Sequence, residues 1–326
     1  MKIVLILPYF GNFPNYFNLH LKTIECNKNI HWLFITNDNS NYDFPENVTV
    51  INTTFNEIQA QFQSHFDFKI CLETPFKLCD FRPAFGLVFQ PYIKDFDFWG
   101  HCDPDILWGN FNNFINAIAP EKYDKIFTFG HLSLYKNEEK NNLRFLENIN
   151  NQERYKTVFS HPIGFAFDEK FNKSINTIYK NNKYAMLLQN VAADIDSYHT
   201  NFRLSIYNYE TNKYFFDGIN KQLFTWENGA VYRYVYTKNK TIEKQEFLYI
   251  HLQKRSMNLN FNPNFSVKIL IMQDEFLILN EEITALNFHK YYKPKWYNKQ
   301  FFKVKYNSFK YKLRHKSYFY GNNKNV

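Results

Sequence analysis

The sequence predicts an α/β protein built on a mostly parallel sheet that helices cover on both faces. The first half of the chain alternates short β-branched or aromatic runs with segments of helical spacing. Apolar residues form 45% and aromatic residues 20% of the 326 residues, which excludes a disordered chain of low hydrophobicity. Only 9 Gly and 11 Pro occur, which argues against collagen-like and low-complexity architectures.

The expected elements follow from these runs in chain order. In the first half, strands are predicted at 2–8, 31–37, 48–52, 97–102 and 125–130. Helical spacing or helix-start signals predict helices at 16–27, 55–66, 83–93 and 111–118. The second half is less regular, with strands predicted at 157–167, 231–236, 247–251 and in a hairpin over 268–280, and helices at 168–179 and 281–288. Because such sheets bind ligands at the carboxyl ends of their strands, we expect the chemistry just after the strands.

The formal charge of +8 is distributed unevenly along the chain. Residues 290–326 contain ten Lys, one Arg, twelve aromatic residues and no acidic residue, whereas the preceding part has 28 basic and 31 acidic residues. No linker rich in Pro, Gly or Ser divides that preceding part. We therefore expect one compact catalytic domain over 1–289, followed by a basic aromatic tail over 290–326.

The composition of the tail favours attachment to a membrane surface. Basic side chains interleaved with amphipathic aromatic rings suit an anionic membrane interface. A solvated tail that only improves solubility is one alternative. A nucleic-acid site is another, but no signature of a recognised nucleic-acid module is present, so we predict no nucleic-acid partner.

The sequence predicts a cytoplasmic location, peripheral at the inner face of the cytoplasmic membrane. No stretch approaches the ~18 apolar residues of a membrane span. The opening apolar run ends at Pro8 and is too short for a signal peptide. The four cysteines form no CxxC pair, which fits a reducing compartment.

An acidic pair follows the strand predicted at 97–102. Residues at i and i+2 of an extended chain point the same way, so Asp103 and Asp105 face one point. Pro104 cannot donate to a sheet ladder, which places the pair at the end of the strand. Two such carboxylates repel unless a cation separates them, and their oxygens suit Mg²⁺ or Mn²⁺ bound to a diphosphate. A polar turn in which Asp105 caps the next helix is the structural alternative.

Two further groups of polar residues fit a metal and phosphate site. His251 ends a strand-like run, and an imidazole beside two carboxylates would favour Mn²⁺. Lys254 and Arg255 follow it closely enough to reach the same diphosphate. Upstream, Lys77, Asp80 and Arg82 lie at a predicted helix start, where backbone N–H groups favour anions. A structural histidine and a surface salt-bridge cluster are the alternatives for these two groups.

In this order the residues resemble a bacterial GT-A glycosyltransferase of capsule or lipopolysaccharide biosynthesis, similar to the family 8 galactosyl- and glucosyltransferases. The matching segments span most of residues 1–255: KIVLILPYFGNFPNYF, LCDFRPAFG, CDPDILWGN, FTFGHLSLYKN and IHLQKR. The resemblance implies a Rossmann-type GT-A fold. It also implies transfer of a hexose from a nucleoside-diphosphate sugar, with a UDP-sugar as the first expectation, to a growing cell-surface glycan or a lipid-linked acceptor.

The resemblance also implies roles for individual residues. Asp103, Asp105 and His251 would hold Mn²⁺ or Mg²⁺. The residues implied at the donor are Tyr9, Gly11, Lys77, Asp80, Arg82, Lys254 and Arg255. The late H-x-x-G-x-x-K-P-W pattern of the family is not reproduced, because this chain reads HLQKR from His251 onward. The lysine that contacts the phosphate therefore stays open.

An inverting transferase also needs a carboxylate base for the acceptor hydroxyl. Asp168 with Glu169 is the first candidate for the base, and Asp194 or Asp196 is the second. Asp168 could instead cap the following helix. His131, just past the strand predicted at 125–130, is expected at the acceptor.

Two rival functions remain open at this stage. The acidic pair could serve a metal-dependent transferase of sugar 1-phosphate. The chain could also be a non-catalytic carbohydrate-binding or assembly protein of an envelope pathway, although the intact set of Asp103, Asp105 and His251 argues against that function.

Overall fold

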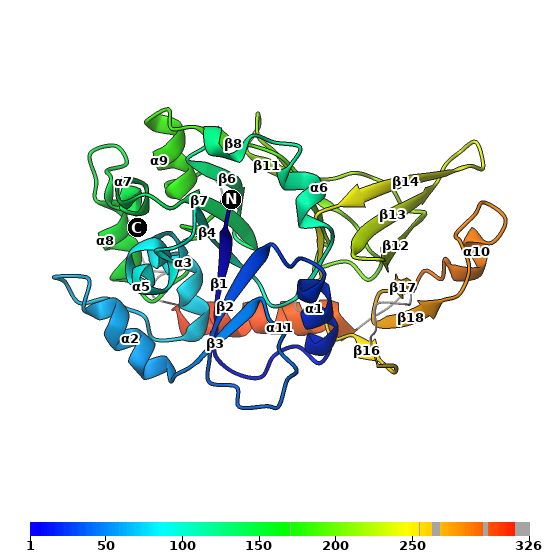
Figure 1. The fold of residues 1–326 in the computed structure, drawn as a ribbon, viewed down its shortest axis with the longest axis horizontal. Helices are drawn as coiled ribbons and strands as arrows, with labels where there is room; N and C mark the ends of the chain where they lie inside the picture. Colours follow the sequence, from blue (N-terminus) through cyan, green and yellow to red (C-terminus); the bar gives the residue numbers. More distant parts are fainter. Residues whose placement is uncertain (170, 254, 263–267, 296–298, 317–326) are drawn as a thin grey trace.

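A seven-stranded, mainly parallel sheet forms the centre of the protein in the computed structural model (Figure 1), which describes residues 1–326 except 170, 254, 263–267, 296–298 and 317–326. The strand order is β3-β2-β1-β4-β7-β6-β8, and β7 alone runs antiparallel to the other six. The strands are β1 (Ile3–Tyr9), β2 (Ile30–Thr36), β3 (Val48–Asn52), β4 (Phe98–Cys102), β6 (Lys125–Phe129), β7 (Leu132–Lys136) and β8 (Met186–Leu187). All five strands predicted in the first half are present, and the α/β class is confirmed.

Both faces of the central sheet are buried, which explains why its strands read as continuous apolar runs. On β1, Val4 and Ile6 join a core cluster with the helices on one face, whereas Leu5 joins the cluster on the other face. The helices around the sheet are α1 (Phe17–Glu25), α2 (Phe55–Gln63), α3 (Leu78–Phe81), α4 (Phe85–Val88), α5 (Gln90–Ile93), α6 (Phe111–Ile115), α7 (Glu139–Asn142), α8 (Arg154–Phe159) and α9 (Ile175–Asn181).

Three of the predicted helices differ from the structure. The helix expected over 83–93 is divided into a 3₁₀ turn, α4 and α5, because Pro83 and Pro91 lack the N–H that a continuous helix needs. The helix expected over 168–179 begins only after Ser174, which caps α9. The helix expected over 281–288 is wrong, since the described chain forms a loop there and the short α10 (Phe288–Tyr291) follows it.

The strand expected over 157–167 is also wrong. Residues 154–159 form α8 instead, and its buried residues Tyr155, Val158 and Phe159 have the spacing of a helix rather than the alternation of a strand. The described residues that follow, up to Asp168, contain no strand.

A second sheet, mostly antiparallel, lies beside the central one, at the right of Figure 1. Its order is β14-β13-β12-β17-β18-β16, formed by β12 (Gln222–Glu227), β13 (Ala230–Tyr236), β14 (Ile242–Phe247), β16 (Asn258–Leu259), β17 (Lys268–Ile271) and β18 (Glu275–Leu279). The predicted strand at 231–236 and the hairpin over 268–280 are confirmed. Helix α1 packs on both sheets, because Phe17 joins the central core while Tyr16 and Leu19 join the core of the second sheet.

Two small sheets complete the fold. One joins β5 (Ile106–Trp108), β15 (Tyr249–His251) and β9 (Ala192–Asp194), and the other is the hairpin of β10 (Ser205–Asn208) and β11 (Lys213–Phe216). In the first of these, β15 runs antiparallel to β5 and parallel to β9. The predicted strand at 247–251 is thus confirmed from Tyr249 onward, and its last residue lies between two other chain segments.

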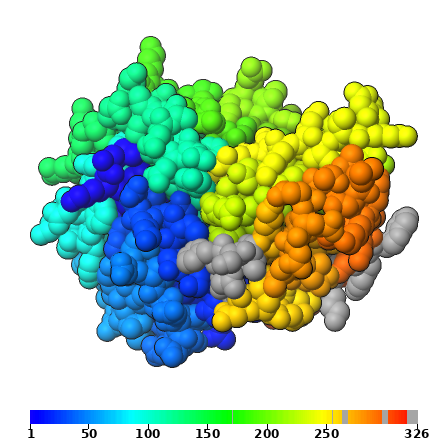
Figure 2. Space-filling view, turned by 45° about the vertical axis from the view of Figure 1, so that its right-hand side comes forward, coloured from blue at the N-terminus to red at the C-terminus, as the bar shows by residue number. Residues whose placement is uncertain are grey.

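Described residues near the C-terminus contact the body of the protein. Helix α11 (Lys299–Arg314) crosses the lower part of Figure 1. The Tyr311 hydroxyl accepts a hydrogen bond from the Gly164 backbone N–H at 2.8 Å, and the Lys305 ammonium lies 5.0 Å from the centre of the Tyr198 ring. In Figure 2 the N-terminal segments, in blue and cyan, and the C-terminal segments, in yellow and orange, belong to one continuous body. The domain boundary at residue 289 stays a prediction.

Candidate metal centre

Three side chains predicted to bind a metal meet at the carboxyl end of β4. Asp103 and Asp105 lie between β4 and β5, and β15 places His251 directly opposite Ile106 of β5. The His251 Nε2 atom is 3.4 Å from an Asp105 carboxylate oxygen and 3.7 Å from one of Asp103. One ligand atom from each residue lies within 4.8 Å of the other two. This set of two carboxylates and one imidazole fits Mn²⁺ and also suits Mg²⁺.

The charges around His251 favour a cation at this point. Burial by itself would lower the pKa of His251, but Asp105 and Asp194 raise it well above its usual range. A protonated imidazole then balances the carboxylates in the absence of a metal. A divalent ion bound between the same groups would supply that positive charge and leave the imidazole neutral.

Arg82 links the metal centre to a second acidic group. Its guanidinium pairs with Asp103 through Nη2, and Nη1 donates to Asp168 Oδ2 at 2.8 Å and to the Gly130 carbonyl at 2.6 Å. Arg82 pairs with Asp103 Oδ1, whereas Asp103 Oδ2 is the oxygen nearer His251. Arg82 was predicted to contact the donor, and the structure shows it engaged with these internal partners.

Asp168 and Glu169 lie beside Gly130, on the far side of Arg82 from the metal centre. A Cβ atom on Gly130 would approach Asp168 Oδ2 and Glu169 Oε2 to 3.0 Å, so only glycine fits there without a shift. Burial raises the pKa of Asp168 to about 7, although Arg82 opposes the rise, and Glu169 adds to it. A carboxyl group that titrates near neutrality is typical of acid-base sites.

Asp194 contacts the other side of the metal centre. It is the last residue of β9 and the direct neighbour of His251 in the parallel register. Its Oδ1 atom is 2.8 Å from His251 Nδ1 and accepts a hydrogen bond from Gln253 Nε2, also at 2.8 Å. Burial would raise the pKa of Asp194, but His131 and His251 lower it below its usual value. Asp196, by contrast, accepts from the Tyr198 backbone N–H in its own turn.

His131, expected at the acceptor, is buried next to the metal centre. Only 6% of its surface is exposed. Its Nδ1 atom is 2.8 Å from the Tyr249 hydroxyl, and its ring centre lies 4.5 Å from that of His251. Burial lowers the pKa of His131 to about 4, so its imidazole is neutral at physiological pH.

Lys77 and Asp80, predicted at the donor, are buried together. The Lys77 ammonium donates to Asp80 Oδ2 at 2.7 Å and to two backbone carbonyls, so all three of its N–H bonds have partners within the chain. Asp80 accepts from the backbone N–H groups of Phe165 and Phe167. This pair holds the chain that leads to Asp168.

Of the two basic residues predicted at the donor after His251, the structure describes Arg255. Arg255 is buried and donates to the Asp196 and His199 carbonyls at 2.9 and 2.6 Å, and burial lowers its pKa to about 10. The predicted role of Lys254 lies outside the described residues.

Tyr9 and Gly11 lie at the carboxyl end of β1. Gly11 has a φ of +116°, and its N–H donates to Asn37 Oδ1 at 2.9 Å, which joins the loops after β1 and β2. Burial first, and then the carboxylates of Asp105 and Asp38, raise the pKa of Tyr9. The Tyr9 hydroxyl is therefore within the field of the metal centre.

Two residues at this site were missed in the sequence. Asp38 follows the strand predicted at 31–37 as Asp103 follows the strand at 97–102, so the same strand-end rule could have found it. Gln253, which supports Asp194, adopts a φ of +53°, and no pattern in the sequence signals that geometry.

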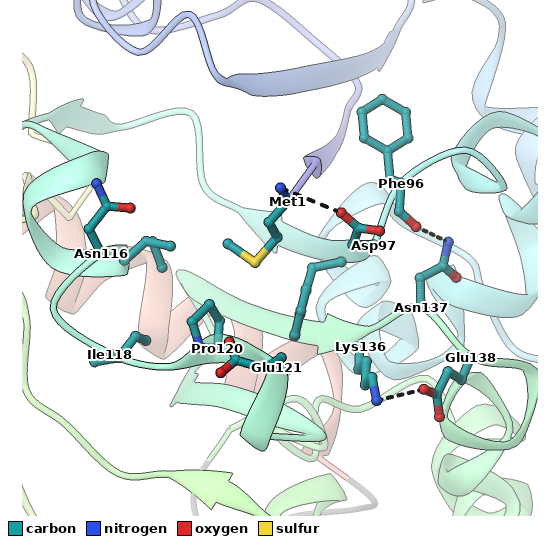
Figure 3. A pocket seen from close by; sticks show the side chains of 12 residues that line it. Met1, Phe96, Asp97, Asn116, Ile118, Pro120, Glu121, Lys136, Asn137 and Glu138 are labelled. Atoms are coloured by element: carbon teal, nitrogen blue, oxygen red, sulfur yellow. Dashed lines mark hydrogen bonds and ion pairs between the residues drawn. The ribbon is translucent and has the colours of Figure 1, made fainter.

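A cavity of about 620 Å³ lies elsewhere, at the amino-terminal edge of the sheet. Figure 3 shows Met1 and Asp97 on one side of it and Lys136 with Glu138 on another. Four of its charged groups form two pairs, with the Met1 amine 3.9 Å from Asp97 and Lys136 2.7 Å from Glu138. Because ligands of such sheets bind at the opposite edge, this cavity is not the candidate site.

Comparison with known proteins identifies the family. Residues 5–287 match the model described as "Family of unknown function (DUF6625)". The chain belongs to this family. No curated protein matches this DUF6625 chain.

Solved structures similar to this DUF6625 chain include glycosyltransferases. The galactosyltransferase LgtC, in complex with donor and acceptor sugar analogs, is 12% identical, with a TM-score of 0.34 over 61% of this chain and 77% of LgtC. GlyE from Streptococcus pneumoniae TIGR4 is 8% identical, with a TM-score of 0.31 over 58% of this chain and 45% of GlyE. Likeness at this level does not establish an activity, so the activity proposed for this DUF6625 chain is argued from its own residues.

Proposed function

We propose that this protein is a divalent-metal-dependent glycosyltransferase. It would transfer a hexose from a nucleoside-diphosphate sugar, first of all a UDP-sugar, to a growing glycan or lipid-linked acceptor of capsule or lipopolysaccharide biosynthesis. One observation carries the proposal: Asp103, Asp105 and His251 converge at the carboxyl edge of the sheet, and Arg82 links them to Asp168, whose pKa is about 7.

Each group has a defined part in such a transfer. A bound Mn²⁺ or Mg²⁺ would stabilise the negative charge on the departing diphosphate. Asp103, Asp105 and His251 would hold the ion, and Arg82 would keep Asp103 oriented. Asp168, with Glu169 beside it, would take the proton of the acceptor hydroxyl in an inverting reaction.

The test compares aspartates at the two edges of the sheet. Asp103→Asn and Asp105→Asn should each reduce the rate of transfer from a nucleotide sugar by at least about a hundredfold. Where no acceptor is known, the rate of donor hydrolysis should fall by the same factor. Asp97→Asn is the matched control, because Asp97 lies next to the same strand at its other end. The donor is found by thermal-shift screening with Mn²⁺, since a ligand at 100 times its Kd stabilises the fold by about 2.7 kcal/mol. Equal rates with Mn²⁺ and with excess EDTA would refute the proposal.

Product analysis separates this function from the sugar-1-phosphate transferase. Glycosyl transfer releases a nucleoside diphosphate, whereas transfer of a sugar 1-phosphate releases a nucleoside monophosphate. Chromatography of the nucleotide product therefore decides between the two.

We also propose that α11 attaches the enzyme to an anionic membrane surface at the cytoplasmic face. Phe302, Tyr306, Phe309 and Leu313 are each 54 to 63% exposed, and their spacing of four, three and four residues forms one stripe along the helix. Lys and Arg side chains flank the stripe, and Tyr311 on the inner side contacts the body. Among the described residues, no helix has the length and apolar character that crossing a membrane requires.

Vesicle sedimentation tests the attachment. The double variant of Phe302 and Phe309 to Ser should lose binding to vesicles containing phosphatidylserine, whereas Tyr92→Ser, at an exposed aromatic residue away from the tail, should bind as the wild type does. Binding should fall as salt shortens the Debye length from about 10 Å at 0.1 M to about 3 Å at 1 M. Equal sedimentation of all three proteins would refute it.

A further inference from the structure

We propose that Asp194 is a positioning residue of the metal centre rather than a base for the acceptor. With His131 and Tyr249 it fixes the His251 ring, so that the Nε2 lone pair faces Asp103 and Asp105. This inference rests on the proposed metal-dependent function.

The three-stranded sheet brings these residues together. β15 lies between β5 and β9, so His251 has the chain next to Asp105 on one side and Asp194 on the other. The Leu252 N–H donates to the Asp105 carbonyl at 2.9 Å, which continues the contact with the acidic loop past the end of the strand. Backbone pairing on both sides therefore fixes the position of His251 independently of its side-chain contacts.

The hydrogen bonds of Asp194 determine which nitrogen of His251 carries the proton. A carboxylate oxygen can only accept, so the contact of 2.8 Å between Asp194 Oδ1 and His251 Nδ1 places an N–H on Nδ1. In the neutral ring this leaves a lone pair on Nε2, which faces Asp105 at 3.4 Å and Asp103 at 3.7 Å. A metal-binding histidine whose other nitrogen donates to a carboxylate is the arrangement that tunes and orients such ligands.

A second pair of residues confines the ring from the side. Tyr249 precedes His251 by two positions on β15, so both side chains project from the same face. The Tyr249 hydroxyl lies 2.8 Å from His131 Nδ1 and can donate to it, which leaves the proton of neutral His131 on Nε2. That atom is 3.9 Å from Asp194 Oδ2, so Asp194 faces two imidazoles.

The same atoms could in principle hold an ion of their own, because His131, Asp194 and His251 each offer a ligand atom within 4.8 Å. At 2.8 Å, however, the Asp194 oxygen and His251 Nδ1 are at hydrogen-bond distance, and an Nδ1 atom that donates its proton to Asp194 has no lone pair for a second ion. The geometry thus supports a single ion on the Nε2 side of His251.

The experiment measures Mn²⁺ binding to the full-length protein without donor, by calorimetry and by electron paramagnetic resonance. Asp194→Ala should weaken Mn²⁺ binding by about 10- to 100-fold. Asp194→Asn, which keeps an oxygen acceptor for Nδ1–H, should lose less, and Asp196→Asn should bind as the wild type does. Nitrogen-15 spectra of the imidazoles in the Mg²⁺ form should show His251 protonated on Nδ1, with that signature lost in Asp194→Ala. Should the Ala variant fail to fold by circular dichroism, the Asn variant and Tyr249→Phe carry the comparison.

Three results would overturn the inference. Wild-type Mn²⁺ affinity in the Asp194 variants that fold, with turnover lost, would make Asp194 a base and leave the metal-dependent function standing. Two ions bound per chain would place one between His131 and Asp194. A wild-type protein that binds no Mn²⁺ would overturn the proposed function and this inference together.

Discussion

Replacing Arg82 with Met tests how the two acidic groups of the site are held together. Met keeps much of the apolar volume of the arginine stem and removes the charge and its hydrogen bonds. Two carboxylates then lose the same cationic partner. One is Asp168, which is buried, and the other is Asp103, which is more exposed. Removing one partner of a buried ion pair costs about 3–5 kcal/mol when the remaining group stays ionised, and uptake of a proton by Asp168 limits that cost.

The pH dependence of this loss identifies Asp168 as its source. Arg82 lowers the pKa of Asp168, and even so burial raises it to about 7. In the Met variant the folded-state pKa lies higher still. Because a raised carboxyl pKa means that the folded state binds more protons than the unfolded state, stability falls as pH rises toward the folded-state pKa. The variant therefore loses further stability above pH 7, by about 1.4 kcal/mol for each additional pKa unit.

Urea unfolding of four proteins at pH 6 and pH 8 measures the effect: wild type, Arg82→Met, Asp168→Asn and the double variant. Arg82→Met should lose about 1.4 kcal/mol more at pH 8 than at pH 6, because Asp168 is ionised in the wild type above its pKa of about 7 and stays protonated in the variant. Asp168→Asn in the Met background should remove this pH-dependent loss, since no titrating carboxyl group is left at that position, giving a coupling energy of about 1 kcal/mol or more at pH 8. Additive effects within about 0.5 kcal/mol, or a loss that is the same at both pH values, would refute this reasoning.

Three further predictions concern neighbouring features. Gly130→Ala should destabilise the protein by about 1–3 kcal/mol in thermal unfolding because its Cβ meets Asp168 at 3.0 Å, whereas Gly164→Ala, with no neighbour nearer than 3.7 Å, should be neutral; equal melting temperatures would contradict this. Ser174→Ala should cost about 1 kcal/mol by removing the cap of α9, and an unchanged urea midpoint would speak against it. Mn²⁺ at 100 times its Kd should stabilise the wild type by about 2.7 kcal/mol but not Asp105→Asn, and the same gain in both would exclude Asp105 as a ligand.

The sequence predicts the central sheet well because its signal is local. Strands such as β1, buried on both faces, read as apolar runs, and their ends are marked by residues that cannot continue the ladder, such as Pro104. The position of Asp103 and Asp105 at the end of β4 follows from the same local rule, although Pro104 and Asp105 form a turn there and not an extended segment. The prediction of a strand over 157–167 was wrong because its apolar residues fit both the alternation of a strand and the spacing of a helix. In the structure Val158 and Phe159 are buried on one face of a helix.

The support around the metal centre could not be derived in this way, because it depends on pairings between distant segments. His251 reaches Asp105 only through the register of β15 on β5, and Asp194 reaches His251 only through the register of β9 on β15. No run of residues encodes those registers. The burial of His131 beside His251 also depends on pairing between distant segments. Its position after a strand therefore predicted the edge of the sheet but not the residues that it contacts there.

The segment from Lys77 to Arg82 shows how one predicted motif divides into two roles. Asp80 accepts hydrogen bonds from the backbone N–H groups of Phe165 and Phe167, which lead to Asp168, and Lys77 donates to Asp80. Arg82, directly after α3, holds the side chain of Asp168 and that of Asp103 at the same time. This one segment therefore contacts both the base candidate and one candidate metal ligand. We expect substitution of Arg82 to move Asp168 relative to Asp103.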